Sequence, residues 1–386
     1  MSSITSIGYK EPSTMPKPRI NRTLKLVLML TLLLPALSLT ASGEDVYLQR
    51  ARRILNKNPL IDGHNDTPWQ FRKRVNSNLD RIDLNGDTSR LWPPMHTDIK
   101  RLRLGSVGGQ FWSVFLPTNQ PNTVAAFHNQ VRLVHKMIDR YPELSLALTA
   151  AQITEHHSRG KIASLLGVEG GHALGSEGSL NELRWLYDNG VRYLTLTHTE
   201  SNPLADSSGG SRRHGGLSQQ GRRVIEEMNR LGMLIDLSHT SDETAEQALA
   251  LSKSPVVFSH SSVRALNPHE RNVPDSLLHK LKQNNGIIML SFVPDFVRKS
   301  PHSKATLTDV ADHFDYVKNL IGVDHIGVGA DFDGISRGPQ GLEDVSKYPQ
   351  LFAELLRRGW TEEELAKVAG GNLLRVLVAN EVNASL

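Results

Sequence analysis

Residues 60–66 read LIDGHND, and the remainder of the chain is organised around this stretch. Its apolar start is typical of a buried strand, which Gly63 ends. His64 and Asp66 follow two positions apart, and side chains at i and i+2 lie on the same side of an extended chain. An imidazole nitrogen and a carboxylate oxygen are both zinc ligands. Alone the pair is a weak signal, so its meaning depends on how other strands end.

The composition limits the chemistry that this chain can carry out. Its 386 residues suffice for one large domain or two ordinary ones. There is no cysteine, so any metal must be held by histidine and carboxylate side chains, and a cysteine nucleophile is excluded. The first 43 residues carry five basic side chains and one acidic one, which accounts for the whole formal charge of +4. The remainder is balanced, so we expect no nucleic-acid partner.

The N-terminal residues 1–43 are typical of a signal peptide. Basic residues up to Lys25 precede an apolar run from Leu26 to Leu39, and small residues follow as far as Gly43. This run is shorter than the ~20 residues that a spanning helix needs. The long basic segment leaves an uncleaved signal-anchor open as an alternative. We therefore expect entry into the secretory pathway, with the protein secreted or membrane-associated outside the cell and residues 44–386 forming a single domain.

Two further kinds of attachment signal can be read from the chain. The C-terminal residues 378–386 lack the hydrophobic tail of a lipid-anchor signal, so no C-terminal lipid anchor is expected. Glycosylation sequons begin at Asn21, Asn65 and Asn383. The first would be lost with the signal peptide, and a glycan on the second would obstruct the site proposed below. Asn383 is therefore the candidate for a glycoprotein.

Short apolar runs separated by helical patterns predict a parallel sheet. Eight such runs in about 270 residues fit a (β/α)8 TIM-type barrel. We expect an extended loop at 67–104, and terminal helices at 348–358 and 362–378 that cover the barrel bottom or a flank. The predicted strands are 60–64, 108–115, 162–169, 192–198, 233–239, 255–260, 286–292 and 325–331.

Six of these eight runs end in a group that can bind a metal or move a proton. Barrel enzymes build their sites at the C-terminal ends of the strands, where all of these side chains would meet. So many histidines at strand ends favour a functional site over a purely structural role. The side chains are His64 with Asp66, Glu169, His198, His239, His260 and Asp331.

The side chains at the strand ends are sufficient for one zinc ion or for two. Two ions ~3.5–4 Å apart need a shared carboxylate and can hold a bridging hydroxide. Glu169 is the natural bridge, because it lies between the early ligand pair and the later histidines along the chain. His64 and Asp66 would then hold one ion, and His239 and His260 the other. The hydroxide would attack a carbonyl carbon.

Three further residues could complete the chemistry, and each has a simpler interpretation. Asp331 could take a proton as general base and return it to the leaving amine, although either Asp331 or Asp333 could instead form a turn. His198 could donate to the developing oxyanion, or it could be a core histidine. Arg271 could clamp a substrate carboxylate, or it could cap a surface loop.

The chain resembles the membrane dipeptidase (renal dipeptidase) family of dinuclear zinc peptidases. The resemblance covers about residues 46–380 and its combination of motifs is specific. The matching motifs are IDGHND at 61–66, GVEGGH at 167–172, LTLTH at 194–198, IDLSH at 235–239, FSHSS at 258–262, RNVPD at 271–275, DFDG at 331–334 and GLEDVSKYP at 341–349.

The resemblance implies the same roles that the residues suggest on chemical grounds. It implies two zinc ions bridged by Glu169, substrate binding by His198 and Arg271, and proton transfer by Asp331. It also implies cleavage of dipeptides with a free carboxylate, including a D-residue at the C-terminal position. Cysteinyl-glycine, the cysteinyl-glycine bond of leukotriene D4 and some β-lactams are substrates in the family. Its members are typically glycosylated, lipid-anchored homodimers.

This chain departs from the family pattern at several positions. Glu200 and Ser201 stand where a structural cysteine is usual, so a homodimer would not be disulfide-linked. Leu204 replaces a usual tryptophan, so a wall of the pocket is expected to differ. Two alternatives to a zinc dipeptidase stay open, namely a barrel metallohydrolase of another amide and a catalytically silent zinc-binding member. Arg271 favours the dipeptidase, because a free substrate carboxylate needs a cation.

Overall fold

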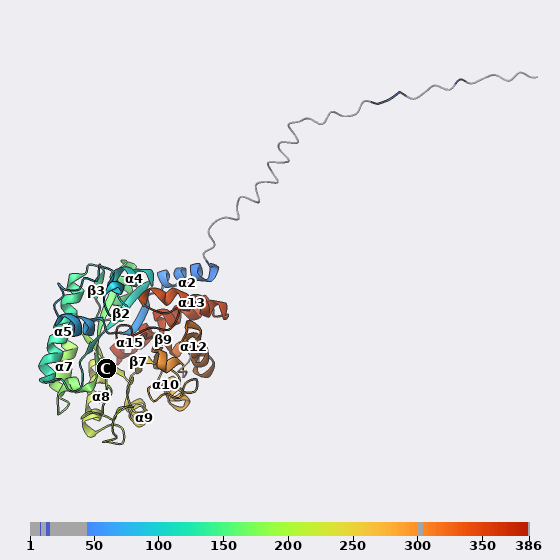
Figure 1. Ribbon diagram of the computed structural model, residues 1–386. Coiled ribbons are helices and arrows are strands. Elements are labelled where there is room, and N and C mark those ends of the chain that lie inside the picture. Colours follow the sequence, from blue (N-terminus) through green and yellow to red (C-terminus); the bar gives the residue numbers. More distant parts are fainter. Residues whose placement is uncertain (1–7, 9–12, 16–44, 299–303, 385–386) are drawn as a thin grey trace, which may run out of the picture. The chain divides into compact units, whose positions relative to one another are not determined.

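The computed structural model describes residues 8, 13–15, 45–298 and 304–384 (Figure 1). Residues 47–386 form one compact unit. The predicted signal peptide at 1–43 lies outside the described residues except at 8 and 13–15, so its presence and cleavage stay predictions. Within the described ranges, no helix combines the length and the apolar character needed to cross a membrane.

The predicted (β/α)8 barrel is confirmed. Every pairing between strands is parallel, and the pairing of β2 with β4 closes the ring β2-β1-β9-β8-β7-β6-β5-β4. All eight predicted runs supply a strand of this ring. The strands are β1 (Leu60–Asn65), β2 (Val107–Phe115), β4 (Ile162–Glu169), β5 (Val191–Thr195), β6 (Leu234–Asp236), β7 (Val257–Ser261), β8 (Ile287–Leu290) and β9 (Ile326–Val328).

A ninth strand, β3 (Leu144–Leu146), was not predicted from the sequence. It pairs with the first residues of β4, and β5 pairs with the later residues of the same strand. Three residues are too few to show an alternating pattern, and only Leu144 among them is buried. The strand therefore forms because β5 leaves one edge of the first residues of β4 unpaired, and not because of a pattern in its own sequence.

Helices lie around the outside of the strands (Figure 1). Their ends follow ordinary capping rules. Ser241 accepts a hydrogen bond from the Thr244 N–H at the start of α9, and Gly232 ends α8 in the left-handed conformation. α2 (Val46–Lys57) precedes the first strand. The helices after β2 and before β9 are α5 (Thr123–Arg140), α6 (Ala150–Ser158), α7 (Leu180–Asp188), α8 (Gln219–Leu231), α9 (Asp242–Leu251), α10 (Asp275–Gln283), α11 (Pro294–Val297) and α12 (Leu307–Ile321).

The prediction of an extended loop at 67–104 was wrong for two segments. α3 (Thr67–Val75) starts at a proline in its first turn and buries Phe71. α4 (Ile99–Leu104) is capped by Asp98, whose side chain accepts a hydrogen bond from the Arg101 N–H. Both helices are short, so their apolar residues span too few turns to give a helical period.

The C-terminal helices divide between the two predicted placements, because α15 closes the interior of the barrel whereas α13 packs against α12 on its flank. α13 (Tyr348–Arg357) and α14 (Glu362–Ala366) lead through a π-helical turn at Lys367–Gly371 into α15 (Asn372–Ala384). Apolar side chains of α15 join the cluster that fills the barrel interior. That cluster includes Ile61, Phe111, Leu165, Tyr193, Leu234, Val257, Ile287, Met289, Leu373, Val376 and Leu377.

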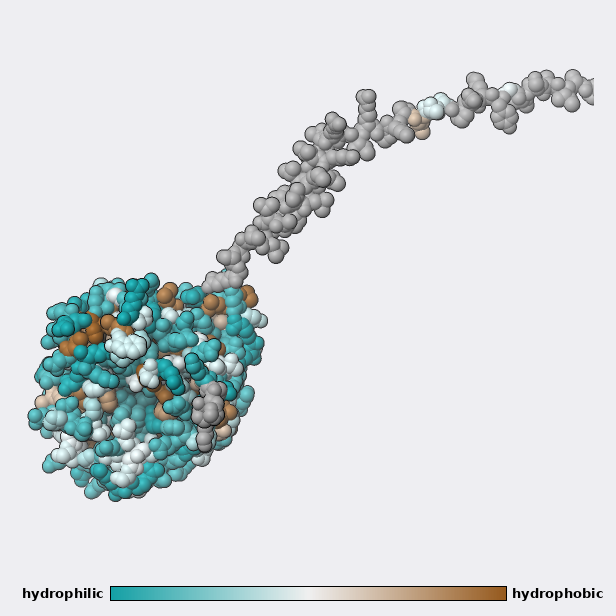
Figure 2. All heavy atoms as spheres, in the orientation of Figure 1, coloured by the Kyte–Doolittle hydropathy of each residue, from teal (hydrophilic) through white to brown (hydrophobic). Residues whose placement is uncertain are grey.

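The apolar side chains are drawn inward, and hydrophilic residues dominate the face of the folded unit shown in Figure 2. Gly63 shows how tightly the interior is packed. A Cβ atom there would lie 2.6 Å from both the Met289 sulfur and the Ser259 carbonyl oxygen. β1 therefore needs a glycine directly before His64, where its backbone packs against β7 and β8.

Asp62 fastens α13 to the strands beneath the site. Its carboxylate accepts hydrogen bonds from the Tyr348 hydroxyl at 2.7 Å, the Ala330 N–H at 2.9 Å and the Gln110 side chain at 3.1 Å. Burial raises the pKa of Asp62, and these donors oppose that rise. A buried carboxylate is stable here because donors from β2, the segment after β9 and α13 surround it.

We expect Tyr348→Phe to lower the free energy of unfolding by about 1–3 kcal/mol, because it removes one donor from a buried acceptor. Urea denaturation would measure the change. Tyr187→Phe is the control, since Tyr187 is half-buried and its hydroxyl has no hydrogen bond to any residue that the structure describes. Equal losses in the two variants would contradict this account of Asp62.

Candidate metal centre and active site

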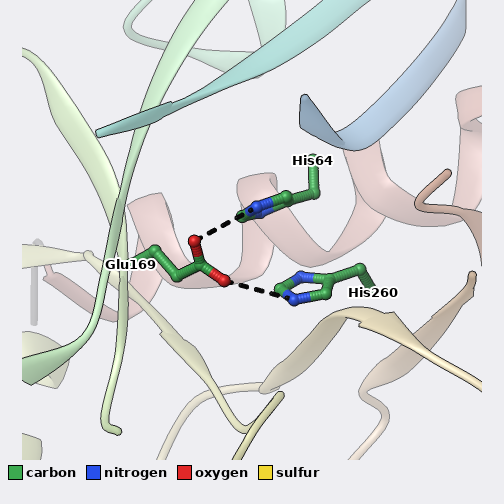
Figure 3. Close-up of side chains that lie close together, drawn as sticks. All are labelled: His64, Glu169 and His260. Atoms are coloured by element: carbon green, nitrogen blue, oxygen red, sulfur yellow. Dashed lines mark ion pairs between the residues drawn. The ribbon is translucent and has the colours of Figure 1, made fainter. Parts of the chain in front are cut away.

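Glu169, the last residue of β4, lies where the predicted histidines converge. Its Oε2 atom is 3.5 Å from His64 Nε2, and its Oε1 atom is 3.4 Å from His260 Nε2 (Figure 3). On the Oε1 side, His239 Nε2 lies at 3.0 Å and His198 Nε2 at 3.6 Å. The two carboxylate oxygens therefore face different sets of histidines.

Two more carboxylates approach from the side of His64. His64 Nε2 lies 3.2 Å from Asp66 Oδ2 and 4.0 Å from Asp331 Oδ1. Gly334 permits this crowding, because a Cβ atom there would lie 2.3 Å from Asp66 Oδ2 and 2.5 Å from Asp331 Oδ1. Three overlapping groups of possible metal ligands result: His64, Glu169 and His260; Glu169, His198 and His239; His64, Asp66 and Asp331.

Several site residues lie beyond the strands that were predicted to end in them. β6 ends at Asp236 and β9 at Val328, three residues before His239 and Asp331. Both side chains sit on left-handed backbone, with φ of 69° at His239 and 68° at Asp331. Non-glycine residues rarely adopt this conformation and it is often found at functional sites. A turn, rather than strand alternation, brings these side chains to the site.

The donor set fits metal ions. His64 Nε2 and Asp66 Oδ1 are buried and have no hydrogen-bond partner among the described residues. The Nε2 atoms of His239 and His260 face each other at 3.0 Å, next to Glu169. Nitrogen and carboxylate oxygen atoms converging without donors between them are stabilised by a shared cation.

Electrostatics point to the same requirement. Burial holds the pKa of His239 and of His260 well below the usual range, so both rings are neutral, the form that binds metals. Burial acts in the same direction on His64, but the neighbouring Tyr193, Glu169 and Asp66 outweigh it and raise the pKa of His64. The carboxylates therefore attract positive charge to His64 Nε2, whether a proton or a metal ion supplies it.

The carboxylates themselves respond in opposite ways. Burial acts to raise the pKa of Glu169, but the surrounding histidines outweigh it and hold that pKa well below its usual range. Burial raises the pKa of Asp331 well above its usual range, against the attraction of His64. Glu169 is thus suited to remain charged, whereas Asp331 lies where a proton can be held.

Exposure separates the predicted metal ligands from the predicted catalytic residues. The side chains of the five predicted ligands are 0–10% exposed, and His239 is the most exposed of them. Those of His198 and Asp331 are 17% and 16% exposed. The two predicted catalytic side chains are therefore the more accessible to a substrate.

Arg271 faces the centre rather than capping a surface loop alone. Its guanidinium carbon lies 5.2 Å from the Phe296 ring centroid, and Nη2 donates a long hydrogen bond of 3.4 Å to the His260 carbonyl oxygen. Burial lowers the pKa of Arg271 to about 10, so it stays positively charged at neutral pH. Among the described residues the guanidinium makes this one hydrogen bond, so most of its donors remain available to a ligand.

Three buried aspartates lie near the site, and of these the sequence suggested a role, that of a turn former, only for Asp333. Asp62 lies within β1 and Asp236 at the end of β6. A carboxylate in an otherwise apolar run could have marked each of them as a buried, hydrogen-bonded residue. Asp333 accepts hydrogen bonds from the Thr67 hydroxyl and the His96 N–H, both at 2.7 Å. Of the two aspartates in DFDG, Asp333 is thus the one committed to holding loops together.

Asn65, the first residue of a sequon, belongs to this framework. It is fully buried, and its side chain bonds to Thr97 and to the Thr67 N–H, each at 2.9 Å. The folded protein has no room for a glycan there.

Comparison with known proteins agrees with this geometry. The model of the membrane dipeptidase family (peptidase family M19) matches residues 48–386. Dipeptidase aclJ of Aspergillus oryzae is 46% identical in an alignment of 337 positions, gaps included, which covers 84% of this chain and 79% of that protein. An uncharacterized dipeptidase of Schizosaccharomyces pombe is 42% identical in an alignment of 402 positions, gaps included, which covers 99% of this chain and 96% of that protein.

A solved structure shares the architecture. The probable dipeptidase PvdM from Pseudomonas aeruginosa superposes with a TM-score of 0.78 at 25% identity, covering 88% of this chain and 99% of that chain. The fold, the convergence of histidines and carboxylates and the family match lead to one conclusion. The chain belongs to the membrane dipeptidase family of metallopeptidases and is a dipeptidase.

Proposed function

We propose that this dipeptidase uses two zinc ions, bridged by Glu169, to hydrolyse dipeptides that have a free C-terminal carboxylate. The observation that carries the proposal is the division of Glu169 between two groups of ligands. Oε2 faces His64, whereas Oε1 faces His239 and His260. A carboxylate placed in this way can be shared between two ions.

The residues divide into metal-binding and substrate-binding groups. His64 and Asp66 would hold one ion, and His239 and His260 the other. When bound, such ions lower the pKa of a water molecule and polarise a carbonyl group. Asp331 accepts a proton from the attacking water at Oδ1 and then passes it to the leaving nitrogen as the C–N bond breaks. His198, a neutral ring because burial lowers its pKa, can donate its N–H to the developing oxyanion.

Arg271 defines the class of substrate. A buried, charged guanidinium with free donors suits a carboxylate, which it can hold in a bidentate pair. The position of this cation close to the Glu169 centre favours a carboxylate one residue beyond the cleaved bond. Substrates would therefore include dipeptides with a C-terminal D-residue, cysteinyl-glycine and leukotriene D4.

We also propose a location and an assembly. Entry into the secretory pathway is supported by the basic, apolar and small-residue order of residues 1–43. The protein would be secreted or membrane-associated outside the cell, with Asn383 as its glycosylation candidate. A homodimer, as the family resemblance suggests, would form without disulfides, because the chain has no cysteine.

The direct test combines zinc analysis with a dipeptide assay on purified protein. We expect two zinc ions per chain and hydrolysis of a glycyl–D-amino acid dipeptide. The C-terminally amidated form of the same dipeptide should be a poor substrate, because Arg271 then lacks a carboxylate partner. Absence of turnover across a dipeptide panel with two zinc ions bound would overturn the proposal, and equal turnover of the amide would point to a different amide hydrolase.

Asp331→Asn should retain both metal ions but lose kcat by about 10²–10⁴-fold, because the amide cannot accept and return the proton. Steady-state kinetics and zinc analysis would measure both quantities. Asp333→Asn is the matched control, since it lies two residues away and should lower stability with little effect on kcat. Loss of metal from Asp331→Asn would instead identify Asp331 as a ligand.

Glu169→Ala should lose both zinc ions, because one carboxylate serves both groups of ligands. Zinc content after dialysis, measured by atomic spectroscopy, tests this prediction. Glu200→Ala, an exposed position on the loop after β5, is the control and should retain its zinc. Full zinc content in Glu169→Ala would refute the shared bridge.

A further inference from the structure

We propose that Asp236 and Ser259 are positioning residues that fix the orientation and tautomer of His260, so that its Nε2 atom presents a lone pair to the metal centre. Both residues lie beneath the site, with exposed fractions of 0% and 1%. The inference rests on the proposed function, since it concerns how a metal ligand is prepared. It assigns a role to two residues that do not reach the metal centre themselves.

The hydrogen bonds around the Asp236 carboxylate allow only one position for the hydroxyl proton of Ser259. The backbone N–H groups of Ser238 and Ser259 donate to Oδ1 at 3.0 and 2.8 Å. The hydroxyls of Thr195 and Ser259 donate to Oδ2 at 2.5 and 2.6 Å. An ionised carboxylate only accepts hydrogen bonds, and four donors meet it here. The single hydroxyl proton of Ser259 is therefore directed to Asp236.

The Ser259 hydroxyl in turn determines which nitrogen of the His260 ring carries a proton. Ser259 Oγ lies 2.8 Å from His260 Nδ1. Because the Ser259 proton is directed to Asp236, Oγ is the acceptor in this contact and Nδ1 carries the ring proton. Ser238 Oγ, the other acceptor near Ser259, lies at 3.5 Å and competes poorly. His260 Nε2 is thus unprotonated where it faces Glu169 Oε1 at 3.4 Å.

The backbone of His260 is held as well. Its N–H donates to Ser238 Oγ at 3.0 Å, so the residue is fixed at the main chain and at the ring. His239 differs, because its Nδ1 atom is buried without a hydrogen-bond partner in the described part of the chain. His260 is therefore the anchored member of the histidine pair, and partners of this kind typically contribute 10–100-fold in metal affinity.

Asp236→Asn gives a sharp test, because it should reverse the direction of the hydrogen bonds from Asp236 through Ser259 to His260 rather than simply remove them. Two backbone N–H groups donate to Oδ1, so the amide oxygen of the variant must occupy that place. Its NH₂ group would then face Ser259 Oγ, and the serine proton would turn toward His260 Nδ1. This favours the tautomer protonated at Nε2, which cannot bind a metal. Ser259→Ala removes the hydroxyl between Asp236 and His260, so neither tautomer of His260 is favoured.

Zinc affinity of the purified full chain, measured by competition with a chromophoric chelator, follows each change. We expect about 10–100-fold weaker binding in Asp236→Asn and a smaller loss in Ser259→Ala. The double variant should bind more tightly than Asp236→Asn alone, because no serine proton then reaches Nδ1. Ser259→Thr retains the hydroxyl and should keep the wild-type affinity. Ser164→Ala is the control, because Ser164 is a buried serine on β4 whose hydroxyl donates to the Ile162 carbonyl oxygen.

Wild-type zinc affinity in Asp236→Asn would overturn the proposal. So would a double variant whose loss of affinity equals the sum of the two single losses, because charge removal or altered packing alone gives additive effects. If Asp236→Asn does not fold, as circular dichroism would show, the comparison of Ser259→Ala with Ser259→Thr decides. Equal affinities in those two would overturn the proposal. A wild-type protein that binds no zinc would overturn the proposed function as well, so the two failures are distinguishable.

Discussion

The concentration of carboxylates and neutral imidazoles around Glu169 is the constraint on which the site depends. Three carboxylates approach His64, and Glu169 meets histidine nitrogens on both of its oxygens. Groups of this kind are costly to bury unless a positive charge is present. The clustered side chains therefore favour the binding of a cation between them.

The barrel supplies the rigidity that such a site needs. Glu169 and His260 lie on strands, and their neighbours are held by pairings on both sides. His239 and Asp331 instead lie on left-handed turns after short strands. Fixed strand positions and strained turns together bring side chains from distant parts of the chain to one point.

Buried aspartates connect the scaffold with the site. Asp62 links β1 to α13 and to the segment that carries Asp331. Asp333 holds the loops that contain Thr67 and His96. Asp236 lies behind His260. Each of these carboxylates accepts two or more hydrogen bonds, so positions beneath the reacting groups are fixed before any ligand arrives.

The sequence by itself determined the eight strands, most of the helices and the candidate residues that meet at the centre. It could do so because apolar runs, capping residues and strand-end polar side chains are local signals. Strand β3, the helices α3 and α4, and the ends of β6 and β9 depend on edges and contacts made in the folded chain. Only the tertiary structure distinguished Asp331 from Asp333 and revealed Asp236 behind Ser259. The direction in which a side chain points is set by neighbours that are remote in sequence, and no local pattern records them.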